Sequence, residues 1–302
     1  FQKLNADNRI WWGQDGDNSP AVKRFLSEVS SGRFPQTLWF YKEVGHTQDA
    51  KKTLLKYVPF QHTENVLNSV KPVELIQRML QLAGPADEEA IILDFFSGSA
   101  ATAHAVLKQN AEDGGKRRFI GVQIAEPLPV PEPDLSSIFE MGTTRIKNVI
   151  RELREEADGT LASGDSDALG FRVLRVDSSN MKDVYYTPDE ATPDLLGGHI
   201  DNIRDGRTDE DLLFQVLLDW GVDLSLPISK ETVGGKTVYF VDTNALAACF
   251  EAGLDDDFVK ELAKREPLRV VFRDSGYGSD DVKINVEQIF KQLSPGTEVK
   301  TL

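Results

Sequence analysis

The most chemically suggestive part of this 302-residue chain is a sharp corner at the end of an apolar run. The run Ile91-Ile-Leu-Asp94 ends in a carboxylate, and the turn after it carries Ser97, Gly98 and Ser99. The carboxylate can take a proton from an amine or a hydroxyl group, and glycine lets the backbone approach a ligand without an intervening Cβ. A phosphate would place a second anion beside Asp94 in a poorly solvated pocket. The corner therefore favours a cationic or zwitterionic ligand, with a plain structural turn as the alternative.

A parallel crossover unit is predicted to hold this corner in place. The apolar pattern predicts a strand over 90–95, a helix that ends near Gln109, and a second strand over 118–125. A strand, a helix and a strand in so short a stretch are typical of a parallel βαβ unit. Ligands bind at the carboxyl ends of such strands, where helix N-termini direct amide donors into the gap. The corner has neither a Gly-x-Gly-x-x-Gly fingerprint nor a P-loop lysine.

The remaining sequence predicts a mixed α/β protein. Thr208 and Asp211 are spaced as in a helix-capping box. A linker is expected over 158–168 and loops over 181–207. Periodicity and turn residues predict the other elements. The expected helices cover 21–29, 72–82, 136–156, a segment from 208, 244–250, 256–264 and 281–293, and the expected strands cover 9–12, 37–41, 169–176, 237–241, 268–272 and 298–301.

Composition limits the classes of protein and site. The net charge is −15, and the excess lies in 127–302, where 19 Lys and Arg face 34 Asp and Glu, so this part is a poor nucleic-acid surface. The single Cys249 cannot form an internal disulfide, which favours a reducing compartment and hence the cytoplasm. No apolar run approaches the roughly 20 residues of a membrane span, so no membrane is expected. The four histidines lack metal-ligand spacing, so no metal is expected, and His104 is interpreted as a packing residue. One ring of Trp11 and Trp12 is expected in the core, with base stacking as the alternative.

Several segments resemble one family of DNA-modifying enzymes. The stretch from Asp94 to Val106 resembles the S-adenosylmethionine-binding box, Asp-x-Phe-x-Gly-Ser-Gly-Thr-Thr, of β-class DNA adenine methyltransferases. The run Lys71-Pro-Val-Glu-Leu-Ile76 looks like the Lys-Pro box that precedes it in that class. Further likeness to the modification (Mod) subunits of type III restriction-modification systems lies in 9–13, 35–39, 43–52, 169–180 and 281–291. By resemblance, the chain is identified as the C-terminal portion of such a subunit.

This resemblance implies a set of cofactor-binding residues. Lys71 and Pro72 would begin the helix beside the methionine end of S-adenosylmethionine. Many relatives place an acid after the second strand for the ribose hydroxyls; here Gln123 holds that position and Glu126 follows, and either side chain can hydrogen-bond a diol. The residues that would line the cofactor at the corner are Asp94, Phe95, Ser97, Gly98, Ser99 and Thr102.

The sequence also departs from the family pattern. Ala100 and Ala101 stand where Gly-Thr is common, which removes a hydroxyl group and adds a methyl group. Such enzymes flip the target base and hold its amine against an Asp/Asn-Pro-Pro-Tyr/Phe box. No two prolines are adjacent in this sequence, so that box is absent and no catalytic residue is expected. Because the chain begins with Phe1, we expect that it starts inside a longer natural protein and does not methylate DNA alone.

The resemblance implies a function and an architecture. The expected reaction is methyl transfer from S-adenosylmethionine to the exocyclic N6 amine of adenine in double-stranded DNA. The expected partners are a second modification subunit, forming a homodimer, and a restriction subunit with helicase and endonuclease activities. The expected fold is α/β, with part of a Rossmann-like methyltransferase core followed by a smaller C-terminal α/β domain. The expected division is a segment after the target-recognition region (1–60), a cofactor-binding part (61–182) and an acidic domain (183–302).

Two other functions stay open. One is a non-catalytic assembly module of a restriction-modification complex, in which the acidic part of the chain mediates assembly and the corner is vestigial. The other is a fragment of an RNA or protein methyltransferase that shares only the cofactor turn.

Overall fold

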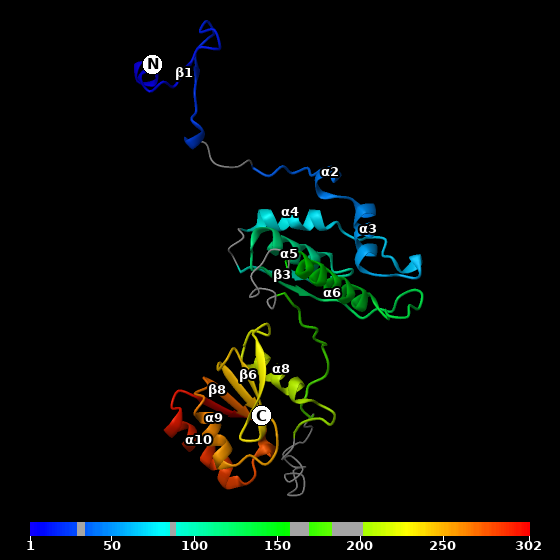
Figure 1. The fold of residues 1–302 in the computed structure, drawn as a ribbon, viewed down its shortest axis with the longest axis vertical. Coiled ribbons are helices and arrows are strands. Elements are labelled where there is room, and N and C mark those ends of the chain that lie inside the picture. The colour runs from blue at the N-terminus through cyan, green and yellow to red at the C-terminus, as the bar shows by residue number, and fades with distance from the viewer. Residues whose placement is uncertain (29–33, 85–88, 158–168, 183–201) are drawn as a thin grey trace, which may run out of the picture. The chain divides into compact units, whose positions relative to one another are not determined.

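The computed structural model describes residues 1–28, 34–84, 89–157, 169–182 and 202–302 (Figure 1). The chain divides into two compact units, residues 1–170 and residues 171–302. Both contain helices and strands, so the expected mixed α/β class is confirmed. The expected linker and most of the expected loop region, 158–168 and 183–201, lie outside the described residues.

The start of the first unit contains only short elements. They are α1 (Gln2–Ala6), β1 (Ile10–Trp11), β2 (Ala21–Val22) and the 3₁₀ turn η1 (Leu26–Glu28), with β1 and β2 antiparallel. The helix expected over 21–29 is therefore wrong across its described part. Its described apolar side chains bury little surface: Val22 is 64% and Leu26 is 90% exposed. The expected burial of a tryptophan is also wrong, because Trp11 and Trp12 are both exposed.

The rest of the first unit contains the predicted crossover. Its elements are α2 (Tyr41–Val44), α3 (Thr47–Tyr57), η2 (Thr63–Asn65), α4 (Val73–Ala83), β3 (Ile91–Asp94), α5 (Ala101–Asp113), β4 (Arg118–Gly121) and α6 (Ile138–Ala157). β3 and β4 are parallel and are joined by α5, so the βαβ expectation is confirmed. Pro72 is the N-cap of α4, where a residue without an N–H is tolerated. The strand expected over 37–41 is wrong, since these residues form no strand and α2 begins at Tyr41.

The two-stranded sheet is covered on one face. There, Ile92 and Phe119 pack on α4 and α5, around a cluster that includes Val73, Leu80 and Val106. Parallel sheets are normally covered on both faces. The second face presents apolar side chains that are each at least 45% exposed: Ile91, Leu93, Ile120, Val122 and Ile124. The described residues therefore leave an apolar sheet face uncovered.

The second unit is a five-stranded mixed sheet between helices (Figure 1). Its elements are α8 (Asp209–Asp219), β5 (Ile228–Val233), β6 (Lys236–Val241), β7 (Leu246–Cys249), α9 (Asp256–Ala263), β8 (Arg269–Phe272), η5 (Asp274–Gly276), α10 (Asp280–Leu293) and β9 (Glu298–Thr301). The strand order is β5-β6-β7-β8-β9, antiparallel up to β7 and parallel from there. Residues of α8 share one core cluster with the sheet, and residues of α9 and α10 share another, so the sheet is covered on both faces. The capping box of α8 is confirmed, because Thr208 and Asp211 exchange hydrogen bonds.

Two expectations in the second unit are wrong. Residues 244–250 do not form a helix; they contain β7, whose side chains are fully buried in the middle of the sheet. Residues 169–176 form no strand and pair with none of the described strands, and Val176 is 99% exposed. β5 was not expected, although the Gly234-Gly235 turn between β5 and β6 has the positive φ angles of a tight hairpin and is a recognisable sequence signal.

Candidate functional site

The corner lies where the two parallel strands of the first unit end. Asp94 and Gly121 are the last paired residues of β3 and β4. Beyond them, Val122 N–H donates to Asp94 O at 2.8 Å and Ser97 N–H donates to Val122 O at 3.1 Å, so the chain after β3 folds over the end of β4. Gly98 has a φ of +50°, a conformation that glycine adopts without steric cost. α5 then begins at Ala101.

The carboxylate of Asp94 is held in position by the turn. Its Oδ2 accepts a hydrogen bond from Thr102 Oγ1 at 2.6 Å, and its Oδ1 accepts one from Phe96 N–H at 3.1 Å. The structure therefore brings Asp94 and Thr102 together, as the sequence suggested. The corner is at the surface, because the neighbouring Phe95 is 64% exposed. One side of the turn is therefore open to solvent, whereas Ser99 and Ala100 on its other side are buried.

The side chain of Gln123 contacts the corner, and no described side-chain hydrogen bond joins Glu126 to it. Gln123 Oε1 accepts a hydrogen bond from Gly98 N–H at 2.7 Å, and its Nε2 donates to Ile124 O at 3.1 Å. Both ends of the amide are thus engaged, and the side chain ties the end of β4 to the turn. Glu126 is exposed, and its described hydrogen bonds are made by its backbone. Of the two alternatives for a ribose contact, the geometry brings Gln123 to the turn.

Ser99 faces inward. It is 5% exposed, and both its carbonyl oxygen and its Oγ accept hydrogen bonds from Arg145 Nη1, at 3.0 and 3.2 Å. Sequence reasoning missed Arg145, although a signal exists: it lies four residues from Met141 and from Val149, on the buried stripe of α6. A charged residue on the apolar stripe of a helix indicates a buried polar contact.

The helix that the Lys-Pro box begins packs against the crossover. Pro72 is buried and Lys71 is exposed. Gly45 lies close beneath Pro72, since a Cβ built at Gly45 would come within 2.9 Å of Pro72 Cβ. The structure thus places Pro72 in the packing at the start of α4. None of the described hydrogen bonds or ion pairs joins Lys71 to the corner.

The histidine of α5 is a packing residue, as the sequence suggested. His104 is 4% exposed, and its ring meets the ring of Tyr57 edge-on at 4.9 Å between centroids. Burial, and then the nearby positive charge of Arg145, lowers the pKa of His104 to about 3. The ring is therefore neutral at pH 7, and its Nδ1 accepts a hydrogen bond from Arg145 Nε at 3.3 Å.

The part of the chain that the structure describes contains no group of three or more His, Cys, Asp or Glu side chains able to hold a metal ion. Its helices include none with the length and apolar character needed to cross a bilayer.

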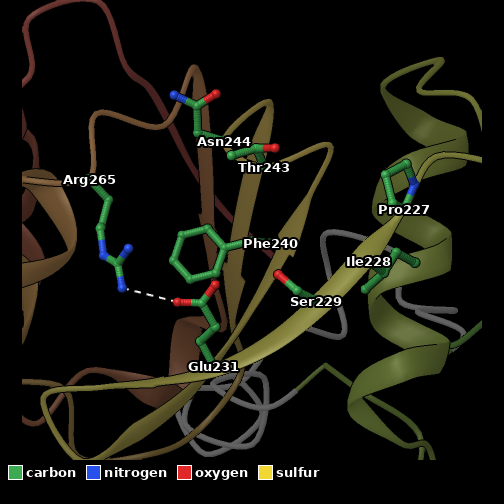
Figure 2. Close-up of a pocket in the computed structure, with 8 residues that line it drawn as sticks. All are labelled: Pro227, Ile228, Ser229, Glu231, Phe240, Thr243, Asn244 and Arg265. Atoms are coloured by element: carbon green, nitrogen blue, oxygen red, sulfur yellow. Dashed lines mark hydrogen bonds and ion pairs between the residues drawn. The ribbon is translucent and has the colours of Figure 1, made fainter. Parts of the chain in front are cut away.

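Two hollows lie away from the corner. The hollow in the second unit has a cavity volume of about 350 Å³, and Phe240, Glu231 and Arg265 are among the residues that line it (Figure 2). Arg265 Nη2 donates to Glu231 Oε2 at 3.0 Å, so its two charged groups neutralise each other, and Phe240 is only 3% exposed. The hollow in the first unit, about 390 Å³, is polar and is lined by Glu43, Val44, Glu74, Gln77, Arg78, Gln81 and Glu112. Neither includes a residue of the corner.

Comparison with known proteins points to the same family as the sequence boxes. Residues 5–128 match the model of the N6_N4_Mtase family, described as DNA methylase. The chain is 32% identical over 200 residues to the type III restriction-modification enzyme StyLTI Mod subunit of Salmonella typhimurium strain LT2, which covers 65% of this chain and 27% of that protein. It is 31% identical over 222 residues to the EcoP15I Mod subunit of Escherichia coli, covering 70% and 31%, respectively.

A third relative extends the pattern to a phage. The EcoPI Mod subunit of Escherichia phage P1 is 31% identical over 166 residues, which is 53% of this chain and 24% of that protein. The matched regions thus span 24% to 31% of the length of these relatives. The family match covers the corner, both strands of the crossover and the Lys-Pro box. The resemblance of this chain to the Mod subunits of type III restriction-modification systems is therefore confirmed, with a DNA methylase match over residues 5–128.

Proposed function

We propose that this chain supplies the S-adenosylmethionine-binding part of a DNA adenine-N6 methyltransferase of the type III modification class. The observation that carries the proposal is the corner itself. A carboxylate, a glycine with positive φ and the start of a helix meet at the carboxyl ends of two parallel strands. In open parallel sheets, ligands bind at this position. The partial Rossmann-like architecture that we infer for the first unit has the same basis.

The donor set at the corner suits a zwitterionic sulfonium compound. Asp94 is an acceptor for an ammonium group. α5 has no acidic residue in its first turn, and its N-cap, Ala100, provides no side-chain cap, so neither neutralises the positive end of the helix, which favours a carboxylate nearby. The exposed ring of Phe95 adds an apolar surface beside these groups. When bound, S-adenosylmethionine supplies an electrophilic methyl group.

We assign a role to each corner residue. Asp94 would hold the amino group of the ligand, and Thr102 keeps the Asp94 carboxylate in position through its 2.6 Å hydrogen bond. Gly98 allows close backbone approach. Gln123, bound to the Gly98 amide, would meet the ribose or yield that amide to the ligand. Four other residues have supporting roles: Ser97 and Ser99 in the turn, and Pro72 and Lys71 at the start of α4.

Methyl transfer to DNA needs groups that this sequence lacks. The amine of a flipped adenine must be held against a Pro-Pro-containing box, and no two prolines are adjacent here. We therefore propose that the chain binds the cofactor and acts on double-stranded DNA only with a catalytic box from outside it. The proposed partners are a second modification subunit and a restriction subunit, by analogy with the relatives' names. A cytoplasmic location remains a prediction, as does the functional division at residues 60 and 182.

A pair of glycine variants tests the proposal. Gly98→Ala places a methyl group at the corner, and Gly114→Ala places one at the opposite end of α5, where a Cβ meets nothing within 4 Å. Both glycines have positive φ, +50° and +70°, so both variants carry similar backbone strain of about 1 kcal/mol. Thermal-shift and calorimetric titrations would use S-adenosylmethionine and S-adenosylhomocysteine, with NAD as the unrelated nucleotide control.

The expected result is binding of both sulfur compounds, but not NAD, by the wild type and by Gly114→Ala, with binding lost in Gly98→Ala. Absence of any binding by the wild type would instead favour the assembly module with a vestigial corner. Equal binding by the two variants would place the cofactor elsewhere. Methylation of RNA or protein, rather than DNA, after the catalytic box is supplied would support the other alternative.

A further inference from the structure

Arg145 is a buried guanidinium that holds the cofactor turn from beneath. It lies on α6, 46 residues after Ser99, and its side chain is 0% exposed. Nη1 donates to the carbonyl and to the hydroxyl of Ser99, and Nε donates to His104. α6 also packs closely against the same turn, because a Cβ built at Gly142 would lie 3.2 Å from Gly98 O. One helix therefore positions the turn through a hydrogen-bonded cation and a close backbone contact.

The positive charge of Arg145 has no carboxylate partner among the described ion pairs. Burial lowers the pKa of Arg145 to about 10, so the guanidinium is still protonated at pH 7. Its hydrogen-bond partners, Ser99 and the neutral His104, carry no charge. Its Nη2 lies buried without a hydrogen-bond partner among the described residues. A buried cation that is not paired costs stability, and an apolar side chain of similar size commonly stabilises such a position instead. Packing alone therefore does not explain an arginine at this position.

A second positive feature occurs at the same turn. The N-terminus of α5 carries the unpaired amides and the positive end of a 13-residue helix. Ala100, its N-cap, offers no side-chain acceptor, and no acidic residue lies in the first turn of the helix. Asp94 is the negative group at this corner, and it is engaged by Thr102 and by the Phe96 amide. The corner thus combines the Asp94 carboxylate with two sources of positive charge, the Arg145 guanidinium and the N-terminus of α5.

We infer that Arg145 is a positioning and specificity residue, which holds the Ser99 turn in place and favours a ligand with a carboxylate beside the N-terminus of α5. The inference rests on the proposed cofactor function and adds to it a basis for recognising the amino-acid end of the ligand. Arg145 acts through the turn and through its charge, and its buried side chain is not assigned a direct ligand contact.

Two ligands separate this role from a merely structural one. S-adenosylmethionine and its decarboxylated form share the adenosine, the sulfonium and the amine, and differ in the carboxylate alone. Calorimetric affinities for both would be measured on the 302-residue wild type and on three variants. Arg145→Gln keeps a donor for Ser99 without the charge. Arg145→Lys keeps the charge. Val149→Ala removes buried apolar volume one turn further along α6 and serves as the destabilised control.

We expect Arg145→Gln to bind S-adenosylmethionine with roughly tenfold lower affinity, because a loss of this size corresponds to one charge interaction in a partly buried site. Its affinity for the decarboxylated form should stay within about twofold of the wild type. Arg145→Lys should retain most of the preference for the carboxylate. Val149→Ala should leave the ratio of the two affinities unchanged.

Three outcomes would overturn the inference. Equal losses for both ligands in Arg145→Gln would mean a structural role only. A wild type that binds both ligands equally well would leave the proposed function standing and remove the role of Arg145. A wild type that binds neither would remove the proposed function as well. If the variants do not fold, hydrogen exchange of the wild-type peptide around Arg145 decides: it should slow with S-adenosylmethionine and not with the decarboxylated form, and equal slowing would overturn the inference.

Discussion

The left-handed backbone of Ala100 is the feature of the corner that a single substitution can test most directly. Ala100 has φ +57° and ψ +36°, and it is 2% exposed. A residue with a Cβ loses about 1 to 2 kcal/mol in this conformation, which glycine adopts freely. The S-adenosylmethionine-binding box that this stretch resembles has glycine at this position. Ala100→Gly therefore relieves strain that the turn now holds.

Three contributions set the net effect of Ala100→Gly on the free energy of unfolding. Strain relief stabilises the folded state by about 1 to 2 kcal/mol. Loss of the buried methyl group costs about 0.8 kcal/mol, and the added freedom of the unfolded chain costs about 0.5 to 1 kcal/mol. The sum is close to zero. Ala105→Gly, at a 0% exposed position inside the same helix, has the same two losses without strain relief, so it should destabilise by about 2 kcal/mol.

Native-state hydrogen exchange of the α5 amides measures both effects as local free energies of opening. The predicted result is little change for Ala100→Gly and faster exchange for Ala105→Gly, with a difference of about 2 kcal/mol. Similar losses in both variants would show that the left-handed backbone of Ala100 is not strained.

Three more predictions follow from the first unit. Burial lowers the pKa of His104 to about 3, against 6.5 in the unfolded chain, so the unfolded state binds a proton first as the pH falls and the stability present above pH 6.5 is lost toward pH 3. Thermal melts should therefore show the wild type losing about 2 kcal/mol more stability than His104→Gln between pH 6.5 and 4.5. Parallel stability curves for the two proteins would contradict this. Asp94→Asn keeps an oxygen acceptor for Thr102 but not the charge, so calorimetry should show a roughly tenfold weaker affinity for S-adenosylmethionine. The control Asp113→Asn, at the far end of α5, should leave the affinity unchanged, and an unchanged Asp94→Asn would exclude that carboxylate from the site. Leu93 and Ile120 are directly paired on the uncovered sheet face, so Leu93→Lys with Ile120→Glu should lower the binding of an apolar dye; equal dye fluorescence before and after would mean that this face is covered in solution.

The sequence alone determined the crossover and the chemistry of its corner. Apolar runs at β3 and β4, with a small-residue turn and a helix between them, leave few arrangements other than a parallel unit with Asp94 at its carboxyl end. Local signals also located helix starts, such as Pro72 at α4 and the Thr208 capping box at α8. These features were predictable because each depends on residues that are near one another in the chain.

Tertiary packing explains two segments whose secondary structure was wrongly predicted from local sequence preference. The alanines of β7 favour a helix in isolation, but their small side chains are buried between α8 on one face of the sheet and α9 and α10 on the other. Two positive-φ residues, Asp242 and Thr243, turn the chain just before this strand. The helix predicted over 21–29 was wrong for the opposite reason: its described apolar side chains stay exposed and bury too little surface to stabilise a helix.

The contacts between α6 and the corner could also not be predicted from residues close together in the sequence. Ser99 turns inward to accept hydrogen bonds from Arg145, which lies 46 residues later on a different helix, and Gly142 of that helix packs against Ala100. Residue type and spacing predicted which groups meet at the end of β3. Only the packing of α6 against the turn decided their conformation and placed a buried positive charge below them, because hydrogen bonds and contacts between distant segments form only when the chain is folded.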